Sequence, residues 1–203
     1  DAANLRRVYE EIERPLVPIL AAARERGILL DTSQLNKLSA EYHAELQKLT
    51  AKIFAVVGKT FNLNSPKQLG EILFDGLKLS VTGLRKTAGG ARSTRESELA
   101  KLREAHPVVA DILDRRELQK LLSTYVDALP PLVASDGALH TCLEQAGTTT
   151  GRMSSRDPNL QNIPADANRG LAIRRAFIAR PQHTFAAFDY SQIEMRVLAV
   201  LSK

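Results

Sequence analysis

The sequence predicts an α+β fold, with a mostly helical half followed by short strands that form an antiparallel sheet. Apolar residues recur at helical spacing through most of the first 130 residues. The Pro130-Pro131 pair then stops the last of these helices, and the turn signal Ser135-Asp136-Gly137 follows. After this turn the segments become short and threonine-rich, as strands are. We therefore expect two units, residues 1–130 and residues 131–203.

The chain opens with helical periodicity over residues 5–23, interrupted at Arg14-Pro15. Proline lacks an N–H and disfavours helix in the residue before it, so we expect two helices or one kink there. Gly27 is a plausible helix C-cap, and residues 28–30 form a short extended piece.

Three more helices follow from their start signals. Asp31 is placed to N-cap a long helix that runs to about Val57 and ends at Gly58. Ser65-Pro66 begins a short helix that ends near Phe74. Pro107 begins another, which continues to Val126. The first unit is thus expected to be an antiparallel helical arm.

Residues 77–94 contain three glycines among hydroxyl and basic side chains, which favours a loop over a packed element. Ser93-Thr94-Arg95-Glu96 fits a capping box that restarts a helix. Between positions 76 and 95 the chain has no acidic residue and five basic ones: Lys78, Arg85, Lys86, Arg92 and Arg95. A second basic stretch, residues 151–180, has six arginines against two aspartates. Both stretches could meet a polyanion, the alternative being a solvated charged surface.

Composition narrows the class of protein further. The 203 residues are 44% hydrophobic and 25% charged with a net charge of +5, which is typical of a soluble globular protein. Cys142 is the one cysteine, so no internal disulfide can form, in keeping with a reducing compartment. No apolar run is long enough for a membrane span, and no signal peptide opens the chain. We expect a soluble intracellular protein. The chain starts without Met and stops at Lys203 inside a predicted helix, so we expect a piece of a longer polypeptide.

In the second unit, residues 139–145 and 148–153 are predicted to be strands, and Asp157-Pro158-Asn159 opens a loop to about Arg169. The apolar run at 185–188 is predicted to be a buried strand that precedes a helix over 192–203.

Asp189 would then stand at the carboxyl end of a strand, where a carboxylate can be held beside a cleft. Magnesium prefers such hard oxygen ligands. On position alone, a helix N-cap is the commoner role for such an aspartate.

The neighbours of Asp189 change this balance. Asp189-Tyr190-Ser191-Gln192-Ile193-Glu194-Met195-Arg196 resembles motif A of the family A DNA polymerases, with Met195 where the family has Leu. The resemblance implies that Asp189 binds two catalytic Mg²⁺ ions and that the Tyr190 carbonyl adds a ligand. It also implies that Glu194 is the steric gate against ribose, with Ser191 and Gln192 at the same nucleotide pocket. On spacing alone, Glu194 would be read as part of a solvated helix face.

Two upstream segments resemble the part of the same family that lines the minor groove of the primer–template duplex. They are Thr-Thr-Thr-Gly-Arg-Met-Ser-Ser at 148–155 and Asp-Pro-Asn-Leu-Gln-Asn-Ile-Pro at 157–164. The resemblance assigns four side chains to this contact: Arg152, Asn159, Gln161 and Asn162. Guanidinium and amide groups suit it, because every base pair presents acceptors in the minor groove. Asn159 could alternatively form a turn.

The basic residues of 78–95, together with Ser93 and Thr94, correspond to the thumb tip of these polymerases, which grips duplex DNA through phosphates. Residues 173–178 also match the family, whereas Asp166 stands where its members often have basic residues. The resemblance covers essentially the whole chain, as a thumb (1–130) followed by the first part of a palm (131–203).

The resemblance implies a DNA-directed DNA polymerase of the bacterial cytoplasm or nucleoid that binds primer–template DNA and dNTP. The second catalytic carboxylate and the fingers are not in this sequence, so the remainder of the polymerase must supply them and the chain alone is expected to be inactive. A non-catalytic nucleic-acid-binding module is the rival reading. A single-subunit RNA polymerase is another, disfavoured by Glu194 and by Gln161-Asn162.

Overall fold

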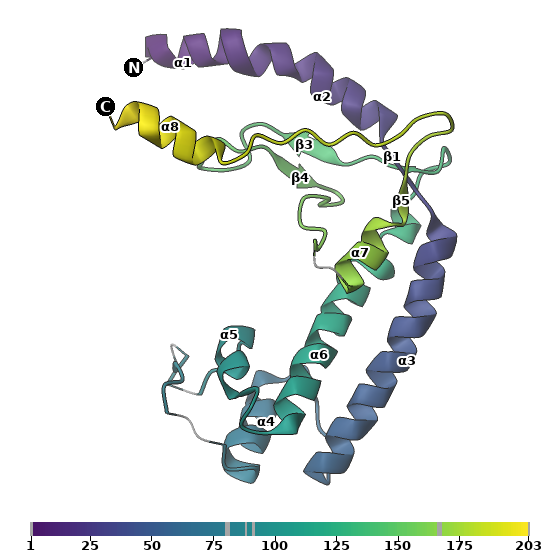
Figure 1. The fold of residues 1–203 in the computed structure, drawn as a ribbon, viewed down its shortest axis with the longest axis vertical. Helices are drawn as coiled ribbons and strands as arrows, with labels where there is room; N and C mark the ends of the chain where they lie inside the picture. The colour runs from purple at the N-terminus through teal and green to yellow at the C-terminus, as the bar shows by residue number, and fades with distance from the viewer. Residues whose placement is uncertain (1, 80–81, 88, 91, 166–167, 203) are drawn as a thin grey trace.

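The computed structural model describes residues 2–79, 82–87, 89–90, 92–165 and 168–202. Helices α3 (Thr32–Val57) and α6 (Pro107–Leu121) run side by side in opposite directions and form a helical arm (Figure 1). One end of the arm holds the short helices α4 (Pro66–Gly70) and α5 (Glu96–Leu99). The other end holds the small sheets, with α1, α2 and α8 beyond them.

Local start and stop signals explain the arm. The Asp31 carboxylate accepts the N–H groups of Ser33 and Gln34 at 3.0 and 3.1 Å and caps α3, which ends at Gly58 with φ +76°. Ser65 caps α4, which continues as a π-helical turn (Glu71–Gly76). A second π-helical turn (Leu122–Val126) extends α6, and a 3₁₀ turn (Pro130–Leu132) follows. These predictions are confirmed.

The N-terminal segment has the two helices that were expected, although a π-helical turn joins them. Helical backbone runs from α1 (Ala2–Val8) through a π-helical turn (Tyr9–Glu13) into α2 (Arg14–Arg26), with no break at Arg14-Pro15. Pro15 lies in the first turn of α2, where its missing N–H costs little. Gly27 ends α2 at φ +62°, and a Cβ there would lie 2.8 Å from the Leu139 carbonyl oxygen. Only glycine fits this close approach.

The strands form two antiparallel sheets. In the first, β1 (Ile28–Leu30) is the central strand between β2 (Ala138–Leu139) and β5 (Phe177–Ile178), with Leu29 opposite both Ala138 and Ile178. The second pairs β3 (Cys142–Glu144) with β4 (Ser154–Arg156). The predicted class, helices with antiparallel strands, matches these two small sheets in a mostly helical chain.

Each end of the arm has its own apolar core. Near the sheets, Leu35, Leu118, Leu122, Leu139 and Ile173 are fully buried in one cluster. At the far end, Ile53, Leu69, Leu73, Leu99 and Ile112 form a second cluster. The loop-bearing end of the arm is therefore a packed body rather than a frayed tip.

Several predicted elements are wrong in position. Residues 148–153 are irregular, with a turn at 149–150, and the strand β4 begins only at Ser154. Residues 139–145 divide at His140 and Thr141 into β2 and β3. The capping box does not form, because α5 begins at Glu96 and the buried Ser93 hydroxyl accepts the Arg95 N–H instead, at 3.3 Å. A 3₁₀ turn (Ala100–Leu102) continues α5.

The predicted strand at 185–188 is also absent. The segment is irregular and pairs with no strand in the described part of the chain, and Phe188 is 95% exposed. The loop after Pro158 leads to α7 (Arg169–Arg174), which was not predicted. Helix α8 (Ile193–Leu201) lies where expected. Asp166 is outside the described residues.

Candidate nucleic-acid and metal site

The turn before α8 presents Asp189 to solvent. Gln192 is the N-cap residue of α8, with φ +51°, so Asp189 does not have the N-cap role that position alone would favour. Within the turn, the Arg196 guanidinium donates from Nε to the Ser191 carbonyl at 3.0 Å, and the Arg196 N–H donates to the Gln192 carbonyl at 3.1 Å. The turn is thus held from the helix side, and the carboxylate of Asp189 stays exposed.

The structure brings two of the predicted site segments together. Arg152 Nη2 lies 3.6 Å from Glu194 Oε1, which links the 148–155 segment to the first turn of α8. Both side chains are more than 70% exposed, so the ion pair itself contributes little stability. The contact nevertheless places Arg152 beside Glu194 of the motif.

Residues 159–164 form a loop whose backbone is tied down from outside. The Tyr125 hydroxyl donates to the Asn162 carbonyl. Arg174 donates from Nε to the Pro164 carbonyl at 2.7 Å and from Nη2 to the Ile163 carbonyl at 2.9 Å. Three successive carbonyls are therefore held by two side chains, and the Asn162 side chain is left on the surface.

Within this loop the other two amides have local partners. The Asn159 Oδ1 accepts the Gln161 N–H at 3.0 Å, which is the turn-forming role considered for Asn159. The Gln161 amide donates from Nε2 to the Met153 carbonyl at 3.1 Å. Gln161 thereby joins the loop to the segment that carries Arg152.

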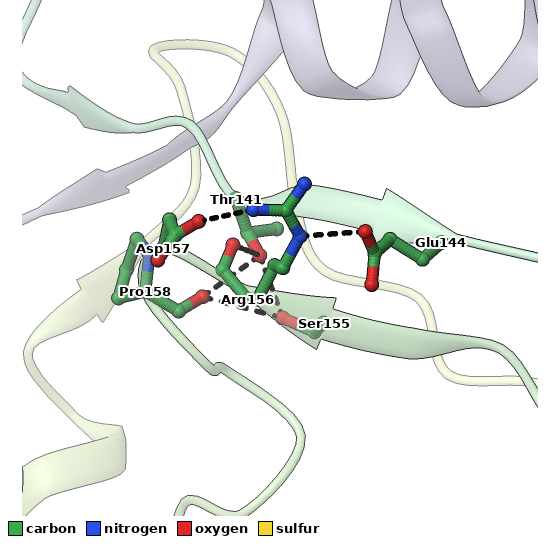
Figure 2. A network of polar contacts seen from close by, with 6 residues as sticks. All are labelled: Thr141, Glu144, Ser155, Arg156, Asp157 and Pro158. Atoms are coloured by element: carbon green, nitrogen blue, oxygen red, sulfur yellow. Dashed lines mark hydrogen bonds and ion pairs between the residues drawn. The ribbon is translucent and has the colours of Figure 1, made fainter. Parts of the chain in front are cut away.

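A polar network anchors this loop to the second sheet (Figure 2). Ser155 is 3% exposed, and its hydroxyl lies 2.6 Å from the Thr141 hydroxyl and accepts the Leu160 N–H at 3.0 Å. Arg156 donates to Glu144 at 2.6 Å and to Asp157 at 2.7 Å. These carboxylates raise the pKa of Arg156, led by the bond to Glu144. Sequence reasoning missed this network, because nothing local marks Ser155 as buried.

The basic loop, residues 76–95, lies at the opposite end of the arm from α8 (Figure 1). Its charged side chains are exposed, at positions Lys78, Arg85, Lys86, Arg92 and Arg95. Arg92 Nη1 donates to Asp75 at 2.8 Å, and its guanidinium lies over the Phe74 ring, 5.5 Å from the centroid. Ser93 and Thr94 are 4% and 5% exposed, so their side chains support the loop rather than face solvent.

A cavity of about 880 Å³ lies between this loop and α4, and its lining includes Lys67, Phe74, Arg92, Arg95 and Arg116. Arg116 comes from α6, and burial lowers the pKa of its guanidinium, which donates to the Thr94 carbonyl. Sequence reasoning did not single out Arg116. The Arg115-Arg116 pair is visible in the sequence, but helical spacing alone does not show which one faces the loop.

The described residues contain no cluster of metal-ligating side chains. Within them, no group of three or more His, Cys, Asp or Glu side chains could hold a metal ion. Asp189 and the adjacent Tyr190 carbonyl can provide part of a magnesium coordination shell, which takes oxygen ligands and usually keeps several waters. The helices of the described chain include none with the length and apolar character of a membrane span.

Comparison with known proteins agrees with the motif. The family model described as DNA polymerase family A matches residues 32–203. The chain is 50% identical over 196 residues to the thermostable DNA polymerase I of Thermus aquaticus, covering 96% of this chain and 23% of that protein. It is 47% identical over 201 residues to DNA polymerase I of Synechocystis, covering 98% and 20%.

A solved structure has the same fold. The chain superposes with a TM-score of 0.87 and 38% identity on the POL domain of Pol1 from M. smegmatis in complex with DNA primer–template and dNTP, covering 97% of this chain and 34% of that one. The chain spans about a fifth of the length of the polymerases it matches. With a family model over most of its residues, the chain belongs to DNA polymerase family A.

Proposed function

We propose that this chain is the part of a DNA-directed DNA polymerase that binds the primer–template duplex and contributes one magnesium-binding aspartate, Asp189. The observation that carries the proposal is the Asp189–Arg196 motif, which spans the exposed turn before α8 and the start of that helix, with Arg152 beside Glu194. The M. smegmatis structure, which contains primer–template and dNTP, supports these as the ligands. In the same division, residues 1–130 are the thumb and its base, and residues 131–203 begin the palm.

Magnesium fits the donor set of this turn, although only in part. Asp189 and the Tyr190 carbonyl would hold it, and the remaining carboxylate would come from outside residues 1–203. When bound, the ions lower the pKa of the primer 3′-hydroxyl and stabilise charge on the transferred phosphoryl group. The side chains of this chain orient the substrates: Glu194, with Ser191 and Gln192, closes the sugar pocket.

Duplex DNA would be held at both ends of the arm. Arg152, Asn159, Gln161 and Asn162 offer donors to the minor groove, where contacts to acceptors common to all base pairs depend little on sequence. The basic loop would neutralise backbone phosphates, which gives affinity that falls steeply with salt. Five exposed basic side chains of the loop and the arginine-lined cavity beside them support this role.

Substitution of Asp189 tests the catalytic part. In the polymerase that contains this chain, Asp189→Asn should lower the rate of primer extension by roughly a thousandfold while duplex binding persists. Asp114→Asn is the control, because Asp114 is an aspartate of α6 in the helical arm. Its variant should extend primers at the normal rate. Normal extension by the Asp189 variant would refute the assignment. Residues 1–203 alone should show no magnesium-dependent extension.

Substitution of Glu194 tests how the polymerase selects deoxyribose over ribose. Glu194→Ala should raise incorporation of ribonucleotides relative to deoxynucleotides, because the side chain that excludes the 2′-hydroxyl is removed. An unchanged ratio would remove the gate assignment. If the wild-type polymerase binds duplex but never extends a primer, the chain is instead a nucleic-acid-binding module.

A further inference from the structure

Glu98 is a buried carboxylate at the base of the basic loop. It lies in α5 and is 4% exposed, beside the fully buried Leu99. A buried charge is tolerated only when it is paired and hydrogen-bonded. Glu98 meets this condition, because its Oε2 accepts the Arg85 N–H at 3.0 Å and the Lys101 ammonium at 2.8 Å.

These bonds connect the basic loop to side chains that lie 13 to 18 positions further along the chain. Lys101 Nζ also donates to the Gly83 carbonyl at 3.1 Å, so Glu98 and Lys101 together hold both Gly83 and Arg85. On its other side, the Arg85 carbonyl accepts the Ser93 N–H at 3.1 Å. The backbone of Arg85 is thus fixed at both its N–H and its carbonyl.

The pairing of Lys86 with Arg92 continues from this fixed point. Apart from it, the described residues 77–95 contain no regular strand or helix, so cross-links such as these help to fix the backbone of the basic loop. Lys101 and the Arg85 N–H lower the pKa of Glu98, in that order, which keeps its carboxylate ionised at neutral pH.

We propose that Glu98 is a positioning residue for DNA binding: without touching DNA, it fixes Arg85, Lys86 and Arg92 in the arrangement that meets phosphates. The proposal rests on the function proposed above for the basic loop. The proposal predicts a change in DNA affinity opposite in direction to the change that the loss of charge alone would cause. Removing a negative charge near a phosphate-binding loop should strengthen binding by charge alone. If Glu98 acts through the loop backbone, removing its charge should weaken binding.

The experiment compares Glu98→Gln with Glu104→Gln in the polymerase that contains this chain. Glu104 is exposed and lies six positions further along the chain, so its variant loses the same charge at a solvent-facing site. Affinity for a primer–template duplex is measured by fluorescence anisotropy over a series of salt concentrations. Glu98→Gln should raise Kd roughly three- to tenfold and make the slope of log Kd against log salt shallower by about 1, since contacts to phosphate are lost. Glu104→Gln should leave Kd unchanged or lower it.

Limited trypsin digestion of the DNA-free proteins reports on the loop independently of function. Cleavage after Arg85 and Lys86 should be roughly three- to tenfold faster in Glu98→Gln and unchanged in the control. Lys101→Gln, which alters an exposed side chain, should accelerate the same cleavages and serves if Glu98→Gln does not fold.

The outcomes separate the two proposals. Unchanged cleavage in both loop variants, or tighter DNA binding by Glu98→Gln, would overturn the role of Glu98. If wild-type polymerase does not bind the duplex while the variants are cleaved faster, the loop cross-link stands, and it is the DNA function that fails.

Discussion

Replacement of Tyr125 by Phe tests whether the 159–164 loop is held from the arm. Tyr125 is 3% exposed, and its hydroxyl donates to the Asn162 carbonyl. Burial raises the pKa of Tyr125, so the hydroxyl stays protonated and remains a donor. Phe fills the same space in the core, and the substitution therefore removes one hydrogen bond and little else.

The expected magnitude follows from the surroundings of the acceptor. A neutral hydrogen bond contributes about 1 kcal/mol net, and a buried acceptor left unpaired costs up to about 3 kcal/mol. Asn162 is an exposed residue, so the lower figure applies. A loss of about 1 kcal/mol corresponds to roughly a fivefold change in the opening equilibrium of the loop. Arg174 continues to hold Ile163 and Pro164, which limits the opening.

Amide hydrogen exchange followed by mass spectrometry gives the measurement. Peptides covering residues 159–165 should exchange about fivefold faster in Tyr125→Phe, with α3 and α6 unchanged. Tyr9→Phe, at a 57% exposed tyrosine of the N-terminal helix, is the control and should change nothing in this peptide. Equal exchange in Tyr125→Phe and wild type would show that the hydroxyl does not hold the loop.

Three further predictions concern the core, the sheet end and the basic loop. Ile112→Ala, at a side chain 1% exposed, should destabilise the far end of the arm by about 2–5 kcal/mol in urea unfolding, and a cost below about 1 kcal/mol would contradict the packing. His140 has a pKa raised above 6.5, first by its bond to the Arg24 carbonyl and then by a neighbouring aspartate. The stability that protonated His140 contributes is complete below pH 6.5 and is lost as pH rises through the pKa of the folded state. The melting temperature should therefore fall across that pH range in the wild type and not in His140→Phe. Parallel pH profiles of the two proteins would exclude this linkage. Replacing Arg85 and Lys86 by Ala should make the salt dependence of duplex binding shallower by about 0.9 per residue, and an unchanged slope would show that neither contacts phosphate.

The helical arm could be predicted from the sequence because its boundaries are set locally. Asp31, Ser65 and Pro107 each begin a helix, and Gly58 ends one, through bonds or backbone angles within a few residues. Such signals are complete in a short window of sequence. The exception is Ser93, which fits a capping box but is buried and bonds the Arg95 N–H instead.

The strands could not be located in the same way, because their pairing is not local. The threonines at 148–150 suit a strand by propensity, yet the ladder opposite β3 begins at Ser154. The apolar run at 185–188 likewise has the composition of a buried strand, but no described strand pairs with it. A strand requires a partner edge, and a single sequence does not say where that edge is.

The candidate site shows the same division. The order of residues from Asp189 to Arg196 and the basic character of the loop are sequence properties, and both predictions still stand as the proposed function. The side chains that hold these segments in place could not be predicted from the sequence. Arg174, Tyr125 and Glu98 bind backbone groups that lie 10 to 37 positions away in the chain. No periodicity marks such contacts.

The three-stranded sheet has a consequence for how the chain folds. Leu29 pairs with Ala138 and with Ile178, so β1 cannot find its neighbours until more than a hundred intervening residues have become compact. Closing loops of that length costs entropy before any ladder bond repays it. The α3–α6 hairpin can form first from contacts along its length, and in doing so it brings Leu29 and Ala138 close together. We therefore expect the arm to fold early and the sheet to close last, with the helices serving as the template on which the strands meet.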